Sequence, residues 1–245
     1  MFKITLAEPS YLLKPVGLIK ELIGEANIKI DKDKLSLLAM DSANVSMIEF
    51  NLLSSAFTEY DVKQDVDLSV NFNNFHQLLK TANANSMISL SLDKKKLFIE
   101  IKGETNRSFH LPLIELTEEE KPKKTNLKFK AKVELNAKQV NNEIDAHGIV
   151  AESTMLVCSK DKFAMIAQGD LSDATTVFNE PKISLEGEKV ACKYSIEYLK
   201  KFFMASTFCD DVTIEFSNDH PVLFTFKQLD KFSLQFTLAP RVEAD

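Results

Sequence analysis

Residues 31–41 read DKDKLSLLAMD and residues 159–170 read SKDKFAMIAQGD, so one segment occurs twice, about half a chain length apart. Other landmarks recur at this spacing: FKI at 2–4 is matched by FKA at 129–131, and FHL at 109–111 by FTL at 236–238. A fixed internal period indicates a repeated structural unit. The sequence therefore predicts two similar domains in tandem.

Alternating apolar and polar residues predict mainly short antiparallel strands, with two helices in each half. The expected strands are 2–6, 27–31, 35–39, 66–72, 87–92, 97–102 and 107–113, then 127–135, 154–158, 163–168, 174–178, 183–194, 212–216, 222–227 and 232–238. The expected helices are 9–23, 73–82, 137–146 and 195–205, with Asn73 and Ser195 as N-caps. Pro15 is expected to kink or shorten the first helix.

The two halves are joined by a charged segment. Residues 117–126 read TEEEKPKKTN, which includes a proline and has no apolar periodicity. Such a segment is typical of an exposed linker. We therefore predict an N-terminal domain at 1–116, a linker at 117–126 and a C-terminal domain at 127–245.

Composition narrows the class of protein. A hydrophobic content of 44% supports packed cores. No apolar stretch is long enough to cross a membrane, and the first residues lack a signal-peptide pattern, so we expect an intracellular protein. The net charge of −6 means that only a local basic surface would bind nucleic acid.

The sequence offers no support for an enzyme. The four histidines have no partner at metal-ligand spacing, and neither a phosphate-binding loop nor a nucleophile elbow is found. Cys158, Cys192 and Cys209 lie in or beside apolar runs and are expected to fill the core. We expect no cofactor and no metal.

Three further motifs point to one family. Residues 37–47 read LLAMDSANVSM and are followed by Leu52, Phe57 and Tyr60; residues 238–242 read LAPRV; residues 109–116 read FHLPLIEL. Together they resemble the sliding clamps called proliferating cell nuclear antigen, over essentially the whole chain. The terminal segment resembles archaeal members.

The resemblance implies an α+β fold in which each domain has antiparallel β-sheets outside and two helices inside. Three chains would close head to tail into a ring of six domains. The expected subunit interface joins an edge strand near 107–116 of one chain to one near 174–179 of the next. Its residues would be Arg107, Phe109, Leu111, Thr175 and Val177.

The resemblance also implies sequence-independent contact with double-stranded DNA. Sliding requires binding to phosphates without reading bases. On the ring-lining helices of the first half, Lys14, Lys20 and Lys80 stand where the family carries basic residues, and His76 lies close by. The candidates in the second half are Lys138, Lys200 and Lys201. The second half is less basic than the family pattern, because Asn141, Asn142, Asp145 and Met204 stand at positions that are often basic.

A second implied activity is the tethering of partner proteins. The family binds a short partner motif that forms one helical turn with apolar side chains. The matching pocket residues are Met40, Ala43, Asn44, Val45, Met47, Pro221, Leu238, Ala239, Pro240 and Val242. The linker departs from the family pattern, being charged and short at its middle, which leaves partner choice open.

The favoured function is a ring-shaped DNA polymerase processivity factor that also tethers flap endonuclease and DNA ligase and is loaded by an ATP-dependent clamp loader. The alternatives are a subunit of a heterotrimeric or checkpoint-type clamp, a protein-interaction platform that does not bind DNA, and a β-rich hydrolase with dispersed catalytic residues. The sequence leaves homotrimer and heterotrimer open. It favours an archaeal cytoplasm over a eukaryotic nucleus.

Overall fold

The computed structural model describes residues 2–116, 122 and 126–242, which form two compact units. Unit 1, the N-terminal unit, comprises Met1–Asn44, Ile48–Lys124 and Gln228–Leu234; unit 2, the C-terminal unit, comprises Val45–Met47, Thr125–Lys227 and Gln235–Asp245. Of the predicted linker, only Pro122 and Asn126 lie within the described residues.

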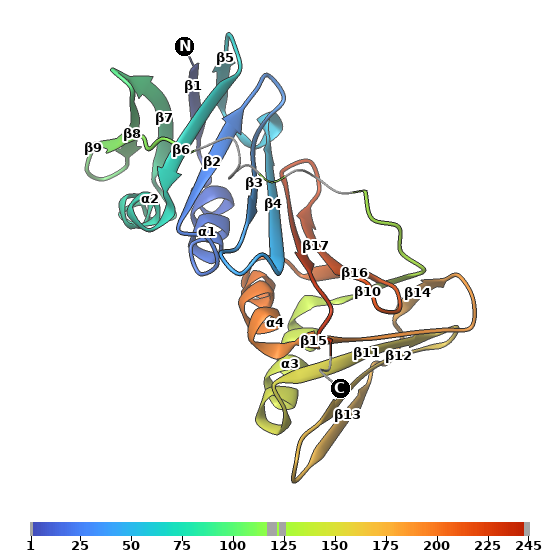
Figure 1. The fold of residues 1–245 in the computed structure, drawn as a ribbon. Helices are drawn as coiled ribbons and strands as arrows, with labels where there is room; N and C mark the ends of the chain where they lie inside the picture. Colours follow the sequence, from blue (N-terminus) through green and yellow to red (C-terminus); the bar gives the residue numbers. More distant parts are fainter. Residues whose placement is uncertain (1, 117–121, 123–125, 243–245) are drawn as a thin grey trace. The chain divides into compact units, whose positions relative to one another are not determined.

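The N-terminal unit contains a five-stranded antiparallel sheet in the order β5-β1-β7-β8-β9 (Figure 1). These strands are β1 (Phe2–Leu6), β5 (Glu59–Val62), β7 (Met87–Asp93), β8 (Lys96–Lys102) and β9 (Arg107–Pro112). Four more strands lie in the order β4-β3-β2-β6. They are β2 (Glu25–Ile30), β3 (Lys34–Met40), β4 (Ser46–Leu53) and β6 (Val66–Asn71). Helices α1 (Ser10–Ile19) and α2 (Phe72–Leu79) and the short 3₁₀ helix η1 (Ser54–Ala56) complete the unit.

The C-terminal unit repeats this order of elements. One sheet has the order β13-β12-β11-β15, and four further strands follow β14-β10-β16-β17. The strands are β10 (Ala131–Asn136), β11 (Ser153–Ser159), β12 (Lys162–Gln168), β13 (Asp173–Val177), β14 (Lys182–Leu185), β15 (Lys189–Ser195), β16 (Asp211–Phe216), β17 (Val222–Gln228) and β18 (Phe232–Leu238). Gln228 of β17 and Phe232–Leu234 of β18 belong to unit 1, and Ser46 and Met47 of β4 belong to unit 2. The helices are α3 (Ala137–Val150), α4 (Ile196–Phe203) and the 3₁₀ helix η3 (Met204–Thr207).

The α+β class with antiparallel sheets and two α-helices in each unit is confirmed. The duplicated segments occupy equivalent places: residues 31–41 include β3, paired with β2, and residues 159–170 include β12, paired with β11. The alternation that predicted these strands buries one face, as at Leu35, Leu37 and Ala39. The repeat in sequence is therefore a repeat in structure.

Aromatic packing closes the core of the C-terminal unit. Phe202 of α4 stacks on Phe236 of β18, with ring centroids 4.5 Å apart and planes inclined by 9°. Phe203 meets Phe224 and Phe226 edge to face, at 5.3 Å in both cases. Fully buried rings of this size supply much of the hydrophobic stabilisation of a small domain.

Several local predictions were wrong. β4 and β5 were missed, and the single strand expected at 183–194 is two strands, β14 and β15. Gly187, at φ +97°, lies in the turn between them, a conformation that a side chain disfavours.

The helix ends also differ from prediction. The side chain of Asn71, not Asn73, caps α2 by accepting a hydrogen bond from the Asn74 N–H at 3.0 Å. Ser195 does occupy the N-cap position of α4, although its side chain makes no capping bond. Helix α1 continues through Pro15 and ends at Ile19, earlier than expected.

Candidate functional site

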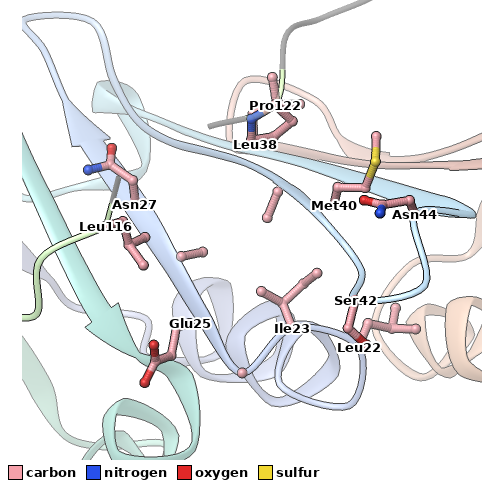
Figure 2. A pocket seen from close by; sticks show the side chains of 13 residues that line it. Leu22, Ile23, Glu25, Asn27, Leu38, Met40, Ser42, Asn44, Leu116 and Pro122 are labelled. Carbon is pink, nitrogen blue, oxygen red and sulfur yellow. The ribbon is translucent and has the colours of Figure 1, made fainter. Parts of the chain in front are cut away.

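A groove of about 570 Å³ opens in the N-terminal unit, beside the end of β3 (Figure 2). Its lining combines apolar side chains with polar atoms in nearly equal share. The lining residues are Leu22, Ile23, Gly24, Glu25, Ala26, Asn27, Leu38, Ala39, Met40, Ser42, Asn44, Leu116 and Pro122. Met40 and Asn44 lie on one side of the groove, and Glu25 and Leu116 lie on the other. Such a groove is suited to apolar side chains of a peptide.

Two of the predicted pocket residues, Met40 and Asn44, line this groove. Met40 is 41% exposed, and the chain turns directly after it, with the Asn44 N–H donating to the Asp41 carbonyl at 3.0 Å. Ala43 lies in the same turn, and its N–H donates to the Asp41 carboxylate at 3.4 Å. The turn therefore presents the end of β3 to the solvent.

The remaining predicted pocket residues belong to the C-terminal unit. There the Ala239 N–H donates to the carbonyl of Val45 at 2.9 Å, which brings those two predicted residues together. Leu238 is buried, whereas Val242 is 83% exposed. The others in this unit are Met47, Pro221 and Pro240.

Sequence reasoning missed the wall of the groove formed by residues 22–27 and by Leu38. Leu38 carried a usable signal: Leu35, Leu37 and Ala39 are the buried set of β3, so Leu38 is an apolar residue on the outward face. An outward apolar residue next to Met40 marks a binding surface better than either residue alone.

The predicted basic residues of the N-terminal unit lie on or at the end of α1 and α2. The imidazole of His76 packs on Gly17, where an added Cβ would lie 3.0 Å from Nε2. Burial, and then the positive charges of Lys20 and Lys80, lower the pKa of His76, while Glu21 opposes this. Lys20, His76 and Lys80 therefore form one basic cluster whose positive charge comes from the two lysines, because the lowered pKa keeps His76 uncharged at neutral pH; Lys20 also pairs with Glu21.

Lys14 is exposed on α1. In the C-terminal unit, Lys138 is exposed at the start of α3.

The other two predicted lysines of the C-terminal unit are paired with acids. Lys200 lies 3.8 Å from Asp145 of α3, and Lys201 lies 2.8 Å from Glu197 one helical turn away. These ion pairs reduce the positive charge that α4 offers to a polyanion.

The predicted interface residues lie on two edge strands. Arg107, Phe109 and Leu111 are on β9, the last strand of its sheet, and Thr175 and Val177 are on β13, the first strand of its sheet. Val177 is 46% exposed. Among the described residues, the outer edge of neither strand is paired.

The described residues contain no group of three or more metal-ligating side chains. All three cysteines are free and buried, as predicted, and burial raises the pKa of Cys158 to about 11. No helix within the described ranges is long and apolar enough to cross a membrane.

Two models of one protein family match this chain. The family model "Proliferating cell nuclear antigen, N-terminal domain" matches residues 1–131, and the model for its C-terminal domain matches residues 123–241. The DNA polymerase sliding clamp of Thermococcus gammatolerans is 31% identical over 93% of both chains. That of Pyrococcus furiosus is 29% identical over 99% of both.

A solved structure has the same fold. PCNA from Thermococcus kodakaraensis superimposes with a TM-score of 0.91 at 22% identity, over 98% of this chain and 100% of that one. The relatives named here come from archaea. The chain therefore belongs to the proliferating cell nuclear antigen family: it is a sliding clamp, a non-enzymatic processivity factor.

Proposed function

We propose that three copies of this chain join head to tail through β9 and β13 and close into a ring around duplex DNA. The proposal rests on a comparison of two strands of one unit with the equivalent two strands of the other. In element order β13 is the counterpart of β4, and β9 is the counterpart of β18. β4 lies next to β18, whereas β13 and β9 have unpaired outer edges among the described residues.

Pairing β13 of one copy with β9 of the next would therefore repeat the arrangement of β4 and β18. Such a heterologous contact must either close into a ring or grow a filament. It would also cover two strand edges that otherwise invite aggregation. The proposed interface residues are Arg107, Phe109, Leu111, Thr175 and Val177. The proposed domains are 1–116 and 127–245, joined by the linker 117–126.

The test uses one variant for each edge. Phe109→Asp should disable β9 and Val177→Asp should disable β13, with Phe109→Leu and Val177→Ala as matched controls. Each disabled variant alone should be monomeric by light scattering, and their mixture should form a dimer through the one intact pair of edges. Self-association of the Val177→Asp variant alone would contradict the head-to-tail arrangement, because β9 would then pair with itself.

We further propose that the helices provide the DNA-binding residues. The cluster of Lys20, His76 and Lys80, with Lys14, supports phosphate contact by the N-terminal unit. Lys200 and Lys201 of the C-terminal unit would contribute less, because both are paired with acids, whereas Lys138 is exposed at the start of α3. Contacts of this kind bind DNA without reading its sequence.

The groove beside Met40 supports the binding of a partner peptide through apolar side chains. The proposed peptide-binding residues are Met40, Ala43, Asn44, Val45, Met47, Pro221, Leu238, Ala239, Pro240 and Val242. A flexible, polarizable Met suits a surface that accepts several partners. The proposed partners are DNA polymerase, flap endonuclease, DNA ligase and an ATP-dependent clamp loader, in an archaeal cytoplasm.

A further inference from the structure

A buried polar network lies at the base of strand β13. His147 of α3 is 1% exposed, and its Nδ1 lies 3.0 Å from Oγ1 of Thr154 on β11. Its Nε2 lies 3.1 Å from Oγ1 of Thr176 on β13. The Thr176 hydroxyl donates to the Glu143 carboxylate at 2.7 Å. One imidazole thus connects a helix to two strands, and one of them is the edge strand.

The number of available protons fixes the direction of these bonds. Thr176 uses its single hydroxyl proton on Glu143, so the imidazole must donate from Nε2 to Thr176. In the neutral imidazole Nδ1 then accepts, and the Thr154 hydroxyl donates to it. The three shorter contacts thereby form one chain that ends on a carboxylate. The Ile166 carbonyl, 3.2 Å from Oγ1 of Thr154, is the alternative acceptor for the same hydroxyl proton.

Protonation of His147 would free the Thr154 hydroxyl to bond Ile166, but it would also place a charge in the protein interior. Burial is the larger effect and lowers the pKa of His147, while the negative charge of Glu143 opposes it. Other charged groups near α3 are held in pairs of their own: Lys200 with Asp145, Lys201 with Glu197 of α4, and Lys132 with Glu134 of β10. The remaining charges on strands packed against α3 are Lys162, Asp173, Asp211 and Glu215.

The hydrogen-bond network of His147 attaches β13 to helix α3, in addition to the backbone pairing of β13 with one neighbouring strand. β13 is bonded on one side to β12, with Thr176 opposite Met165. Successive side chains of a strand point to opposite faces, so Thr176 faces the network, and Thr175 and Val177 point the other way. Fixing Thr176 therefore fixes how the proposed interface residues of this edge are presented.

We propose that His147 is a positioning residue that anchors the edge strand β13 through Thr176, and that this anchor loosens in acid. The consequence for subunit joining rests on the proposed head-to-tail ring, whereas the anchor itself is a property of the single chain. The direction of the pH effect follows from the burial of His147. A histidine whose pKa is lower in the folded than in the unfolded state stabilises above its unfolded value, about 6.5, and loses that contribution as the pH falls.

The test measures amide hydrogen exchange of β13 and solution mass on the same samples, between about pH 7.5 and about pH 5.5. In the wild type, protection of the β13 amides, corrected for intrinsic rates, should fall by up to about tenfold more than that of the β11–β15 pairing, which is the most that one histidine can contribute over this pH range. Glu143→Gln keeps an acceptor for Thr176 but removes the opposing charge, so the midpoint should move to lower pH. A role in packing alone would not move this midpoint.

His147→Leu should remove the pH dependence and leave β13 less protected even at neutral pH, because Thr176 loses the hydrogen bond from the imidazole. The hydroxyls of Thr154 and Thr176 can still donate to the Ile166 carbonyl and the Glu143 carboxylate, so neither is left without an acceptor. His147→Gln, with one donor and one acceptor, should restore part of the neutral protection without the pH response. His110→Gln is the matched control, because His110 lies on the other edge strand, β9, with its Nε2 3.2 Å from the Asp93 carboxylate. An unchanged pH response in His147→Leu would overturn the proposal.

The two readouts separate the two proposals. A wild-type chain that stays monomeric while the β13 amides respond to pH would support the anchor and contradict the self-associating ring. A trimer whose mass and β13 exchange ignore both pH and His147→Leu would support the ring and overturn the anchor. In a trimer with an active anchor, His147→Leu should raise the dissociation constant at neutral pH about tenfold or more.

Discussion

Met40 illustrates how one residue carries both fold and function. It is the last residue of β3, it is 41% exposed, and it lines the groove with Leu38 and Pro122. The family resemblance of the motif around it marked the residue as functional, whereas its exposure could be learned only from the structure. The opposite wall at residues 22–27 carried no comparable signal in the sequence, since a groove depends on which segments the fold brings together.

Met40→Asp should abolish binding of a partner peptide, because a carboxylate cannot be desolvated in an apolar groove without a partner. A fluorescence titration with an apolar peptide carrying paired aromatic residues measures the change in affinity. Leu92→Asp is the matched control, since Leu92 is similarly exposed at 37% but lies on β7, away from the groove. Peptide affinity retained by Met40→Asp would remove the groove from the binding surface.

His147 shows what a single sequence does not reveal. No sequence pattern connects His147 with Thr154 and Thr176, because the three lie on different elements and only the fold places them within hydrogen-bond distance. The basic cluster could be predicted, because the family resemblance pointed to Lys20, His76 and Lys80.

Replacing Lys20 and Lys80 together by Ala should weaken DNA binding and reduce its dependence on salt. For each phosphate that the protein no longer neutralises, the slope of log affinity against log salt should become shallower by about 0.9. The comparison variant replaces Lys200 and Lys201, whose charges are already paired with Asp145 and Glu197, and should change the slope less. Equal slopes for the wild type and the Lys20/Lys80 variant would exclude these two lysines from the phosphate-binding surface.

At the scale of elements, regular alternation was predictable and special positions were not. β3 and β12 were recognised because their buried residues alternate, whereas β5, Glu59–Val62, is short and has no buried residue. The interval between β14 and β15 was overlooked because the single Gly187 was too weak a signal to interrupt the alternation on either side. The N-cap of α2 was misplaced by two residues, because Asn71 and Asn73 are equally good caps by type.

Asn71→Ala should reduce the free energy of unfolding by about 1 kcal/mol, because it leaves the Asn74 N–H without its capping oxygen. Urea denaturation measures the change. Asn73→Ala is the matched control: Asn73 is exposed inside α2, so removing its side chain should be neutral or slightly stabilising. A greater destabilisation at Asn73 than at Asn71 would contradict the observed helix start.

At the scale of the whole molecule, the sequence repeat was the strongest signal. It predicted two units with the same order of elements, and both the structure and the two family models bear out the repeat. The ring was implied by the family resemblance alone, because a single sequence does not show which edge strands pair with another copy of the chain. The structure adds a physical reason, since β9 and β13 are the unpaired counterparts of β18 and β4 among the described strands.

The most direct test of the ring is the solution mass of the purified chain alone, measured by light scattering on a sizing column at neutral pH. The account predicts three times the chain mass of 27.7 kDa, or about 83 kDa, because a head-to-tail contact that closes at three copies leaves no free edge. A mass of 27.7 kDa would contradict the self-sufficient ring.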